Sequence, residues 1–306
     1  MSRARALGYR LLGPRFDYLL HLRPAEWPIV SAHFLTGSAL AVGLPGLGGE
    51  LRRGPLLLAL LAWVIGLNGG TLALNSAFDR DEGDVAYLRA PPPPPRRLAA
   101  ASLGLMTAGL GAAFLLPAGF AAAYAVCFAL SIVYSVPPAR AKAVPGLDWA
   151  INMAGFGFLT PFAGYAATGL RPTGPPLGVL LAFALLFGAL YPLTQLYQLD
   201  EDALRGDRTL AIALGARRSL LLAAAMAAAA FALLFWTAAG SRWWGGAERG
   251  LRAAGLAIAG AAWGTVIGTW LARLGRLTPR DHQHRMYVAL AAWAVTDAAV
   301  LAAWGR

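Results

Sequence analysis

Long apolar runs recur from residue 28 to the end of the chain, and they constrain its fold more than any other feature. A helix needs about 20 consecutive apolar residues to cross the hydrocarbon core of a bilayer. The strand-like alternation that a membrane barrel requires is missing from the sequence. We therefore expect an all-α polytopic membrane protein. Its nine expected spans are 28–47, 55–75, 98–117, 119–136, 147–168, 176–197, 219–239, 253–272 and 286–304.

The composition agrees with a membrane protein and excludes other classes. Of the 306 residues, 58% are hydrophobic and 13% are charged, with a mean hydropathy of +0.56. The charged share is about half that of a typical soluble domain, which argues against a soluble enzyme and a disordered chain. A single cysteine, Cys127, excludes an internal disulfide and a multi-cysteine metal site. We expect the first apolar run to be retained as a span, because the polar segment before it does not resemble a signal peptide.

The net charge of +11 indicates membrane orientation rather than a nucleic-acid partner, because the basic residues lie between the apolar runs. Suppose that the N-terminus and the loops after even-numbered spans share one side of the membrane. That side then holds 19 of the 26 lysines and arginines, and the other side holds 7. Cytoplasmic loops carry such an excess. We expect a cytoplasmic N-terminal segment, 1–27, and one membrane domain, 28–306, in the cell (inner) membrane.

The acidic residues are concentrated after two of the expected spans. Eight of the 15 lie in two short stretches, 79–84 and 200–207, which follow the second and the sixth spans. Both stretches therefore face the cytoplasm in the expected topology. Carboxylates at a helix C-terminus are disfavoured by the helix dipole and by their mutual repulsion, so we expect a positive partner to offset them.

Helical spacing places oxygen-bearing side chains on one face of each of these two segments. Asn75 and Asp79 are four residues apart, and so are Gln198 and Asp202. Amides and carboxylates that begin inside apolar runs indicate a functional site, because a membrane disfavours them. Two such sets aimed at one cavity suit Mg²⁺, which binds one or two carboxylates together with phosphate oxygens and water. Solvated loop ends are the alternative interpretation of either stretch.

A basic pair follows the fourth span on the same expected side of the membrane. Lys142 is the only lysine in a chain with 25 arginines, and it stands two residues from Arg140. Together they are suited to bind a diphosphate, Lys142 as a point charge and Arg140 as a planar fork. An ordinary cytoplasmic anchor is the alternative interpretation of the pair.

At these residues the sequence resembles the UbiA family of intramembrane prenyltransferases, over roughly residues 20–300. The resemblance implies nine helices around a central cavity that opens to the cytoplasmic side. It also implies Mg²⁺-dependent transfer of an isoprenyl group from its diphosphate to an acceptor, often an aromatic one. A quinone-ring precursor is the broadest expectation, and the family's precedent leaves carotenoid, tetrapyrrole and glycerol-phosphate acceptors open. The motifs that carry it are Leu22-Arg23-Pro24-x2-Trp27, Asn75-x3-Asp79 with Asp81-Glu82-Gly83-Asp84, Tyr134-Ser135-x-Pro137-Pro138-x-Arg140-x-Lys142, and Asp200-Glu201-Asp202-x3-Gly206-Asp207.

The resemblance implies roles for individual residues. Asp79, Asp202, Arg140 and Lys142 are the expected catalytic residues. The expected metal ligands are Asp79, Glu82, Asp84, Asp200, Asp202 and Asp207, and the expected substrate-binding residues are Asn75, Tyr134, Arg140, Lys142, Tyr197 and Gln198. Two positions depart from the family's usual pattern, because Gly83 and Gln198 stand where an acid is common. In the second stretch Asp200 or Glu201 is an alternative to Gln198.

Two polar residues inside spans are expected to be structural. His33 is expected to be a buried, hydrogen-bonded histidine, and Asp297 to have a buried partner. Two other functions stay open, a transporter whose acids bind a coupling ion and a family member that binds substrate without catalysis. Transporter sites lie near the membrane midplane, whereas these acids lie at one face. The expected partners are prenyl diphosphate, a small acceptor and the bilayer, with no nucleic acid and no protein partner.

Overall fold

The computed structural model describes residues 3–79, 84–85, 87–204, 206–240 and 248–305, apart from the side chains of 50–52 and 201. Its elements over these residues are helical, with one isolated bridge between Val85 and Leu88, so the all-α expectation is confirmed. The elements are α1 (Arg3–Leu12), η1 (Gly13–Arg15), α2 (Phe16–His21), α3 (Trp27–Gly46), α4 (Glu50–Leu61), η2 (Ala62–Gly69), α5 (Gly70–Asp79), α6 (Leu98–Ala113), α7 (Ala118–Ser135), η3 (Ala141–Ala143), α8 (Leu147–Asn152), η4 (Met153–Leu159), α9 (Thr160–Ala166), α10 (Pro175–Gln195), α11 (Leu199–Leu204), α12 (Leu210–Ala239), α13 (Arg249–Arg273), η6 (Leu274–Arg276) and α14 (Pro279–Trp304).

Seven helical segments of the described chain are long and apolar enough to cross a membrane, so the protein is a multi-pass integral membrane protein. The shorter helix α6 and the consecutive elements α8, η4 and α9 cover the third and fifth expected spans. A count of nine crossings stays a prediction. Lipid offers no hydrogen bonds, so a spanning backbone must bond within itself as a helix. The seven segments are Trp27–Gly46, Arg53–Asp79, Ala118–Ser135, Pro175–Gln195, Leu210–Ala239, Arg249–Arg276 and Pro279–Trp304.

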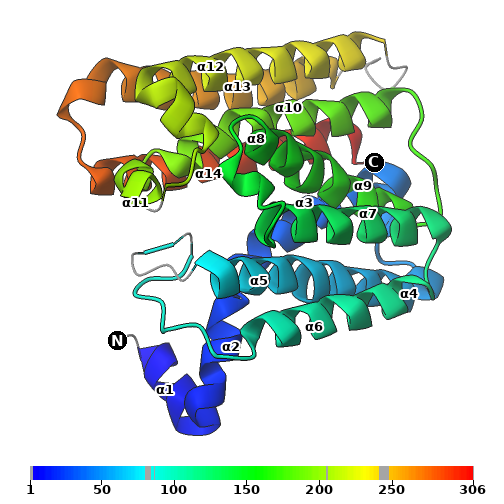
Figure 1. The fold of residues 1–306 in the computed structure, drawn as a ribbon. Coiled ribbons are helices and arrows are strands. Elements are labelled where there is room, and N and C mark those ends of the chain that lie inside the picture. The colour runs from blue at the N-terminus through cyan, green and yellow to red at the C-terminus, as the bar shows by residue number, and fades with distance from the viewer. Residues whose placement is uncertain (1–2, 80–83, 86, 205, 241–247, 306) are drawn as a thin grey trace.

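The helices pack around two hydrophobic clusters. One cluster is formed mostly by α10, α12, α13 and α14, and includes the fully buried Trp263 and Trp270. Figure 1 shows α10, α12 and α13 side by side. The other is formed mostly by α3, η2, α6, α7 and α9, and includes Trp63 and Tyr124. Phe162 packs against both clusters. The fold therefore has two packed halves with a seam between them.

Two glycines let α3 and α9 approach each other closely. A Cβ atom at Gly37 would collide with the carbonyl group of Pro161, and one at Gly164 would collide with the carbonyl oxygen of Phe34. The hydroxyl of Ser38 donates a hydrogen bond of 2.8 Å to the Gly164 carbonyl. Small residues are common at helix contacts in membranes for this reason. The contact fixes α3 in place within its half of the fold.

Two of the helical segments contain π-helical stretches. One, η2, connects α4 to α5, and the other, η4, connects α8 to α9. A π-helical turn contains more residues than an α-helical turn, and such turns occur frequently at functional sites. Both stretches supply side chains to the same cavity, Trp63 and Asn68 from η2 and Phe156 from η4.

The described residues of the two acidic stretches lie at the same end of the bundle. Figure 1 shows the end of α5, the short helix α11 and the start of α14 together at this end, with α1 and α2 beside them. The helix α2 packs against α5. Asp79, in the first stretch, and Asp202 and Asp207, in the second, are therefore placed where their side chains can reach one site.

Candidate active site

A cavity of about 310 Å³ lies between the two packed halves. Its lining includes Trp63 from one hydrophobic cluster and Trp293 from the other. Most of the lining is apolar or aromatic. At one end, which we name the charged end, it is lined by Asp79, Lys142, Asp202 and Asp207. A ligand that fits this cavity has a charged part and an apolar part.

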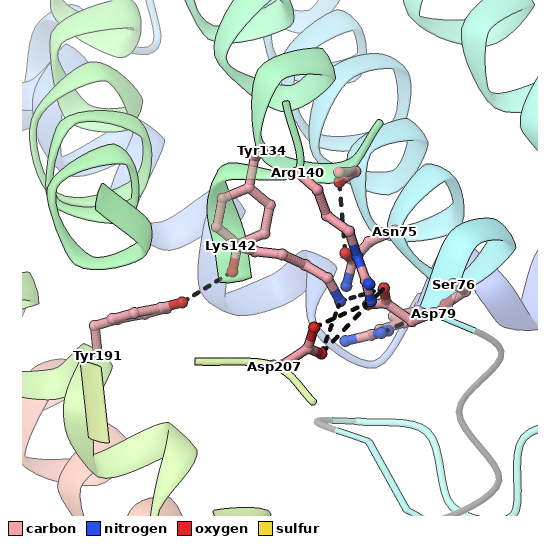
Figure 2. Close-up of polar contacts among 10 residues, drawn as sticks. Asn75, Ser76, Asp79, Tyr134, Arg140, Lys142, Tyr191 and Asp207 are labelled. Atoms are coloured by element: carbon pink, nitrogen blue, oxygen red, sulfur yellow. Dashed lines mark hydrogen bonds and ion pairs between the residues drawn. The ribbon is translucent and has the colours of Figure 1, made fainter. Parts of the chain in front are cut away.

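Lys142 and Arg140 join the two acidic stretches (Figure 2). The Lys142 ammonium contacts the Asp79 carboxylate and lies 3.9 Å from Oδ2 of Asp207. Nη2 of Arg140 lies 3.6 Å from Oδ1 of Asp79 and 3.3 Å from Oδ1 of Asp207. The side chains of both aspartates are 4% exposed, so water screens these ion pairs weakly. The structure thus brings two distant carboxylates to one pair of cations.

The turn between α7 and α8 places these cations. Helix α7 ends before Pro137 and Pro138, which cannot continue its hydrogen-bonding pattern. Arg140 has a φ of +33°, a left-handed conformation that is uncommon for residues other than glycine. Its N–H donates a hydrogen bond of 3.1 Å to the carbonyl of Val136. The turn directs the side chains of Arg140 and Lys142 towards the same acidic pair.

Asn75 lies one helical turn before Asp79 on α5 and lines the cavity. Its Oδ1 accepts a hydrogen bond of 3.5 Å from the hydroxyl of Ser135, the last residue of α7. Arg23, which belongs to a motif but was not an expected site residue, also lines the cavity. It is 6% exposed, and its Nη2 donates a hydrogen bond of 3.5 Å to Oγ of Ser76. Because Arg23 precedes the first span, only the folded arrangement reveals its position.

The second acidic stretch contributes Asp202 and Asp207 to the cavity lining, and both residues are buried. Asp200 is exposed and does not line the cavity. Glu82, another expected metal ligand, lies outside the described residues, as does the side chain of Glu201. Of the six expected ligands, the cavity lining therefore brings together Asp79, Asp202 and Asp207.

Gln198 links the second acidic stretch to the first. It lines the cavity, and its Nε2 donates a hydrogen bond of 3.3 Å to the backbone carbonyl of Asp84. The carboxylate of Asp84 does not line the cavity and accepts the N–H of Ala90 at 2.9 Å. The amide group of Gln198 thus connects the two acidic stretches by a hydrogen bond. The carboxylate of Asp84 instead stabilises the loop between Asp84 and Ala90.

Asp148 anchors the second acidic stretch, although it belongs to no motif that could be recognised in the sequence. It is fully buried, and its Oδ2 accepts hydrogen bonds from Nε2 of Gln195 at 2.9 Å and from the N–H of Leu210 at 3.0 Å. Oε1 of Gln195 in turn accepts the N–H of Ala211 at 3.1 Å. These bonds hold both ends of the segment 196–209 against the start of α8.

Aromatic rings line the cavity beside the charged end. The hydroxyls of Tyr134 and Tyr191 lie 2.9 Å apart (Figure 2), and Tyr197 also lines the cavity. The ring of Phe187 stacks on that of Tyr191, with centroids 6.4 Å apart, and meets Trp293 edge-on at 5.7 Å. Aromatic faces attract cations, so this wall suits a positively charged organic intermediate.

A titratable carboxyl lies at the edge of the cavity. Glu26 directly precedes α3, lines the cavity and is 8% exposed. Burial raises the pKa of its carboxyl to about 7, and the charge of Arg23 opposes part of this shift. Burial also raises the pKa of Tyr87, and the Glu26 charge adds to that shift. The charge at this edge therefore changes near neutral pH.

The oxygen donors of the charged end fit Mg²⁺. Among the described residues, no three acidic, histidine or cysteine side chains are arranged to hold a metal by themselves. Mg²⁺ needs only one or two carboxylates, because substrate phosphates and water complete its octahedral shell. Carboxylates of Asp79, Asp202 and Asp207 line a space that is also wide enough for a ligand. The donor chemistry therefore agrees with a metal that arrives with an anionic substrate.

Sequence comparisons agree with this geometry. The model of the UbiA prenyltransferase family matches residues 32–273. The lycopene elongase/hydratase of Halobacterium salinarum is 30% identical over 211 residues, which are 67% of this chain and 74% of that protein. The lycopene elongase/hydratase of Haloarcula japonica is 30% identical over 210 residues, which are 65% of this chain and 67% of that protein.

Solved structures share the fold. A UbiA homologue from Archaeoglobus fulgidus bound to DMAPP and Mg²⁺ is 17% identical, with a TM-score of 0.65 over 91% of this chain and 98% of that chain. The apo UbiA homologue from Aeropyrum pernix K1 is 20% identical, with a TM-score of 0.61 over 89% and 96%. At such identities the likeness establishes the fold, whereas the family match spans most of the sequence. This chain therefore belongs to the UbiA prenyltransferase family and is a prenyltransferase.

Proposed function

We propose that the protein transfers an isoprenyl group from its diphosphate to a carotenoid polyene of the lycopene type, in the presence of Mg²⁺. The observation that carries the transfer is the meeting of both acidic stretches at Lys142 and Arg140, beside an apolar cavity. The charged end binds the diphosphate, and the apolar part accommodates the isoprenyl tail and the acceptor.

Lys142 and Arg140 stabilise the departing diphosphate. When the C1–O bond of the donor breaks, its electron pair leaves with the diphosphate, and negative charge grows on the leaving oxygens. Cations that are already held in place in a shielded site stabilise this charge better than mobile water does. The contacts with Asp79 and Asp207 hold the two cations in place before substrate binds.

Asp79, Asp202 and Asp207 would hold Mg²⁺ against the diphosphate. With Lys142 and Arg140, these three carboxylates sum to a charge of −1 when all five groups are ionised. A diphosphate therefore meets no net attraction from this set unless a divalent cation accompanies it. When bound, Mg²⁺ supplies Lewis-acid stabilisation of the leaving oxygens.

The aromatic wall stabilises the allylic cation after the diphosphate departs. Tyr134, Tyr191 and Phe187 present rings to the part of the cavity next to the charged end. Their faces attract positive charge, and the apolar lining limits the access of water to the cation. This favours capture of the cation by the acceptor over capture by water.

Two observations support a polyene acceptor. The lycopene elongase/hydratases named above align with about two thirds of this chain at 30% identity. In addition, Arg23 and Lys142 are the only arginine and lysine among the described lining residues, and Lys142 belongs to the charged end. An apolar chamber with few cations suits a hydrocarbon better than an acidic ring. An aromatic quinone-ring precursor is the second candidate acceptor.

The test is a transfer assay with the purified full-length protein, Mg²⁺ and DMAPP. Lycopene, a quinone-ring precursor or no acceptor is added, diphosphate release is measured, and products are identified by mass. We expect a product heavier than lycopene by an isoprenyl unit, and none when EDTA removes the metal. Transfer to the ring precursor alone would overturn the proposed acceptor. Absence of Mg²⁺-dependent diphosphate release would overturn the proposed transfer.

Two measurements separate this transferase from the two alternative functions. A protein that binds substrate without catalysis would bind DMAPP without releasing diphosphate. A transporter would move a labelled ion or solute into proteoliposomes. Its binding site would lie near the midplane of the membrane, whereas the charged end lies at one end of the bundle, so the geometry favours the enzyme.

A further inference from the structure

A buried histidine–aspartate pair lies beside the same cavity, and its histidine, His33, is one of the lining residues. Nδ1 of His33, on α3, lies 3.2 Å from Oδ1 of Asp297, on α14. The two side chains are 6% and 10% exposed. The residues are 264 positions apart, so the pair forms only where the first and last candidate spans pack together. An intramembrane carboxylate is unfavourable and is usually retained for a specific role.

The other ring nitrogen of His33 has no partner among the described residues. Nε2 is buried without a hydrogen bond, and His33 lines the cavity. Asn68 lines the same cavity, and its Nδ2 is also buried without a hydrogen bond. Buried polar groups are almost always hydrogen-bonded. Nε of Arg23, which also lines the cavity, is a further such atom, and together these exceptions indicate that the cavity binds a polar or charged species.

Packing holds the His33 ring in one orientation. Phe183 and Trp293 contact it edge-on, with ring centroids 4.7 Å and 4.9 Å away. A neutral ring that donates its Nδ1–H to Asp297 keeps a lone pair on Nε2. An imidazole that is oriented by a carboxylate and has a free nitrogen in a substrate cavity is the arrangement of a general base.

We propose that Nε2 of His33 accepts the proton that the acceptor loses during prenyl transfer, and that Asp297 positions the ring. This inference rests on the proposed function. The π electrons of an acceptor double bond form the new bond to C1 of the donor, which leaves a cationic carbon on the acceptor. A neighbouring C–H bond then breaks, its electron pair forms a new double bond, and the proton goes to Nε2. The diphosphate keeps the electron pair of the C1–O bond.

The bases nearer the charged end are less suited to this step. Asp79 and Asp207 already contact Lys142. Glu26 precedes His33 by seven residues, which is about 10 Å along a helix, and lies outside the span. His33 is the one histidine among the described lining residues, and its ring contacts Phe183 and Trp293, in the apolar part that the proposed function assigns to the acceptor.

The first test separates cleavage of the donor from proton loss by the acceptor. Wild type, His33→Gln and Asn68→Leu are assayed with Mg²⁺, DMAPP and lycopene, and diphosphate release and prenylated product are measured separately. General-base catalysis contributes about 100-fold or more, so His33→Gln should lower product by about that factor while diphosphate release stays within about twofold. Without the base the new carbon–carbon bond breaks again and restores the acceptor double bond, water captures the regenerated allylic cation, and prenyl alcohol accumulates.

An isotope effect distinguishes a base from a merely structural residue. With lycopene deuterated in its end groups, product formation by His33→Gln should slow further, because proton loss has become limiting. Asn68→Leu removes a polar group that cannot accept a proton, so it should show no such effect. Equal losses of release and product in His33→Gln, or unchanged product, would overturn the role of His33.

The second test does not depend on turnover. The chain has four histidines, so nitrogen-15 labelling of histidine gives few resonances, and the His33 signals are those that His33→Gln removes. We expect a neutral ring with an unprotonated Nε2, and a changed tautomer in Asp297→Asn. A ring protonated at Nε2 would overturn this inference and leave the proposed function standing. If the wild type shows the expected tautomer but prenylates no acceptor, the proposed function is overturned instead.

Discussion

Asp79 and Asp207 stand 128 residues apart in the chain, and both lie within ion-pair distance of the ammonium group of Lys142. The three side chains are at most 10% exposed. A buried ion pair loses much of its stability when one partner is removed, because the remaining charge is left uncompensated. Lys142 therefore holds the two acidic stretches together, and in the proposed function it is also the cation that meets the diphosphate.

We expect Lys142→Met to lower Mg²⁺-dependent diphosphate release from DMAPP by about 100-fold, because a fixed positive charge is lost at the leaving group. Lys142→Arg keeps the charge but changes its shape, so it should recover only part of the rate. Arg217→Met, at an exposed arginine of α12, is the matched control. Release by Lys142→Met within a few-fold of wild type would contradict this role.

The second acidic stretch offers a comparison of neighbouring carboxylates. Asp202 is buried and lines the cavity, whereas Asp200 is exposed and does not. Asp202→Asn should abolish diphosphate release or raise the Mg²⁺ concentration that it needs by about tenfold or more. Asp200→Asn should retain most of the activity. Mg²⁺ titrations of both variants measure this difference, and similar losses in the two would refute the assignment.

Asp148 should matter for stability. Removal of its carboxylate in Asp148→Ala leaves the Gln195 amide and the Leu210 N–H without their buried acceptor. Hydrogen bonds to charged groups contribute about 1.5–3 kcal/mol each, so the variant should lose about 3 kcal/mol of stability. Thermal unfolding in detergent measures the loss. Asp17→Ala, which removes an acceptor of the Tyr9 hydroxyl in the N-terminal segment, should lose much less.

Glu26 makes stability depend on pH. Burial raises the pKa of its carboxyl from 4.5 to about 7 in the folded protein. Between these values the folded protein keeps a proton that the unfolded chain has released, so stability falls as pH rises. The fall should total about 3 kcal/mol and level off above pH 7. Unfolding midpoints between pH 5 and pH 8 should decline for wild type and decline less for Glu26→Gln; parallel curves would disprove the assignment.

The contact between α3 and α9 predicts a steric effect. In Gly164→Val the new Cβ atom would collide with the Phe34 carbonyl oxygen, which belongs to the backbone and cannot turn aside. Overpacking costs about 1–3 kcal/mol, and the variant should unfold at a clearly lower temperature than wild type. Gly104→Ala on α6 meets no atom and should be neutral or slightly stabilising. Equal unfolding temperatures for Gly164→Val and wild type would argue against this close approach.

Charged residues were the part of the site that could be predicted from the sequence. Charge is rare in an apolar chain, so Asp79, Lys142 and Asp202 stand out, and the structure places all three in the cavity lining. Helical spacing shows which side chains share a face, but it does not show what that face meets. For this reason Asp200 and Asp84 could not be separated from the residues that line the cavity.

Contacts between distant segments could not be predicted. The expectation that His33 and Asp297 each have a buried partner is confirmed, but nothing in the sequence indicated that they pair with each other. Asp148 stands at the start of an apolar run without a motif of its own, and its partners come from two later segments. The π-helical stretches η2 and η4 have no sequence signature that was recognised.

The pairing of the first and last candidate spans has a consequence for biosynthesis. Besides the His33–Asp297 contact, the N–H of Leu44 after the kink in α3 donates a hydrogen bond of 2.8 Å to the carbonyl of Gly305, directly after α14. Met286 and Trp293 of α14 complete the chamber wall. While the ribosome is still translating the chain, this wall is missing. A nascent or truncated polypeptide that lacks α14 therefore lacks both this part of the chamber wall and the carboxylate partner of His33.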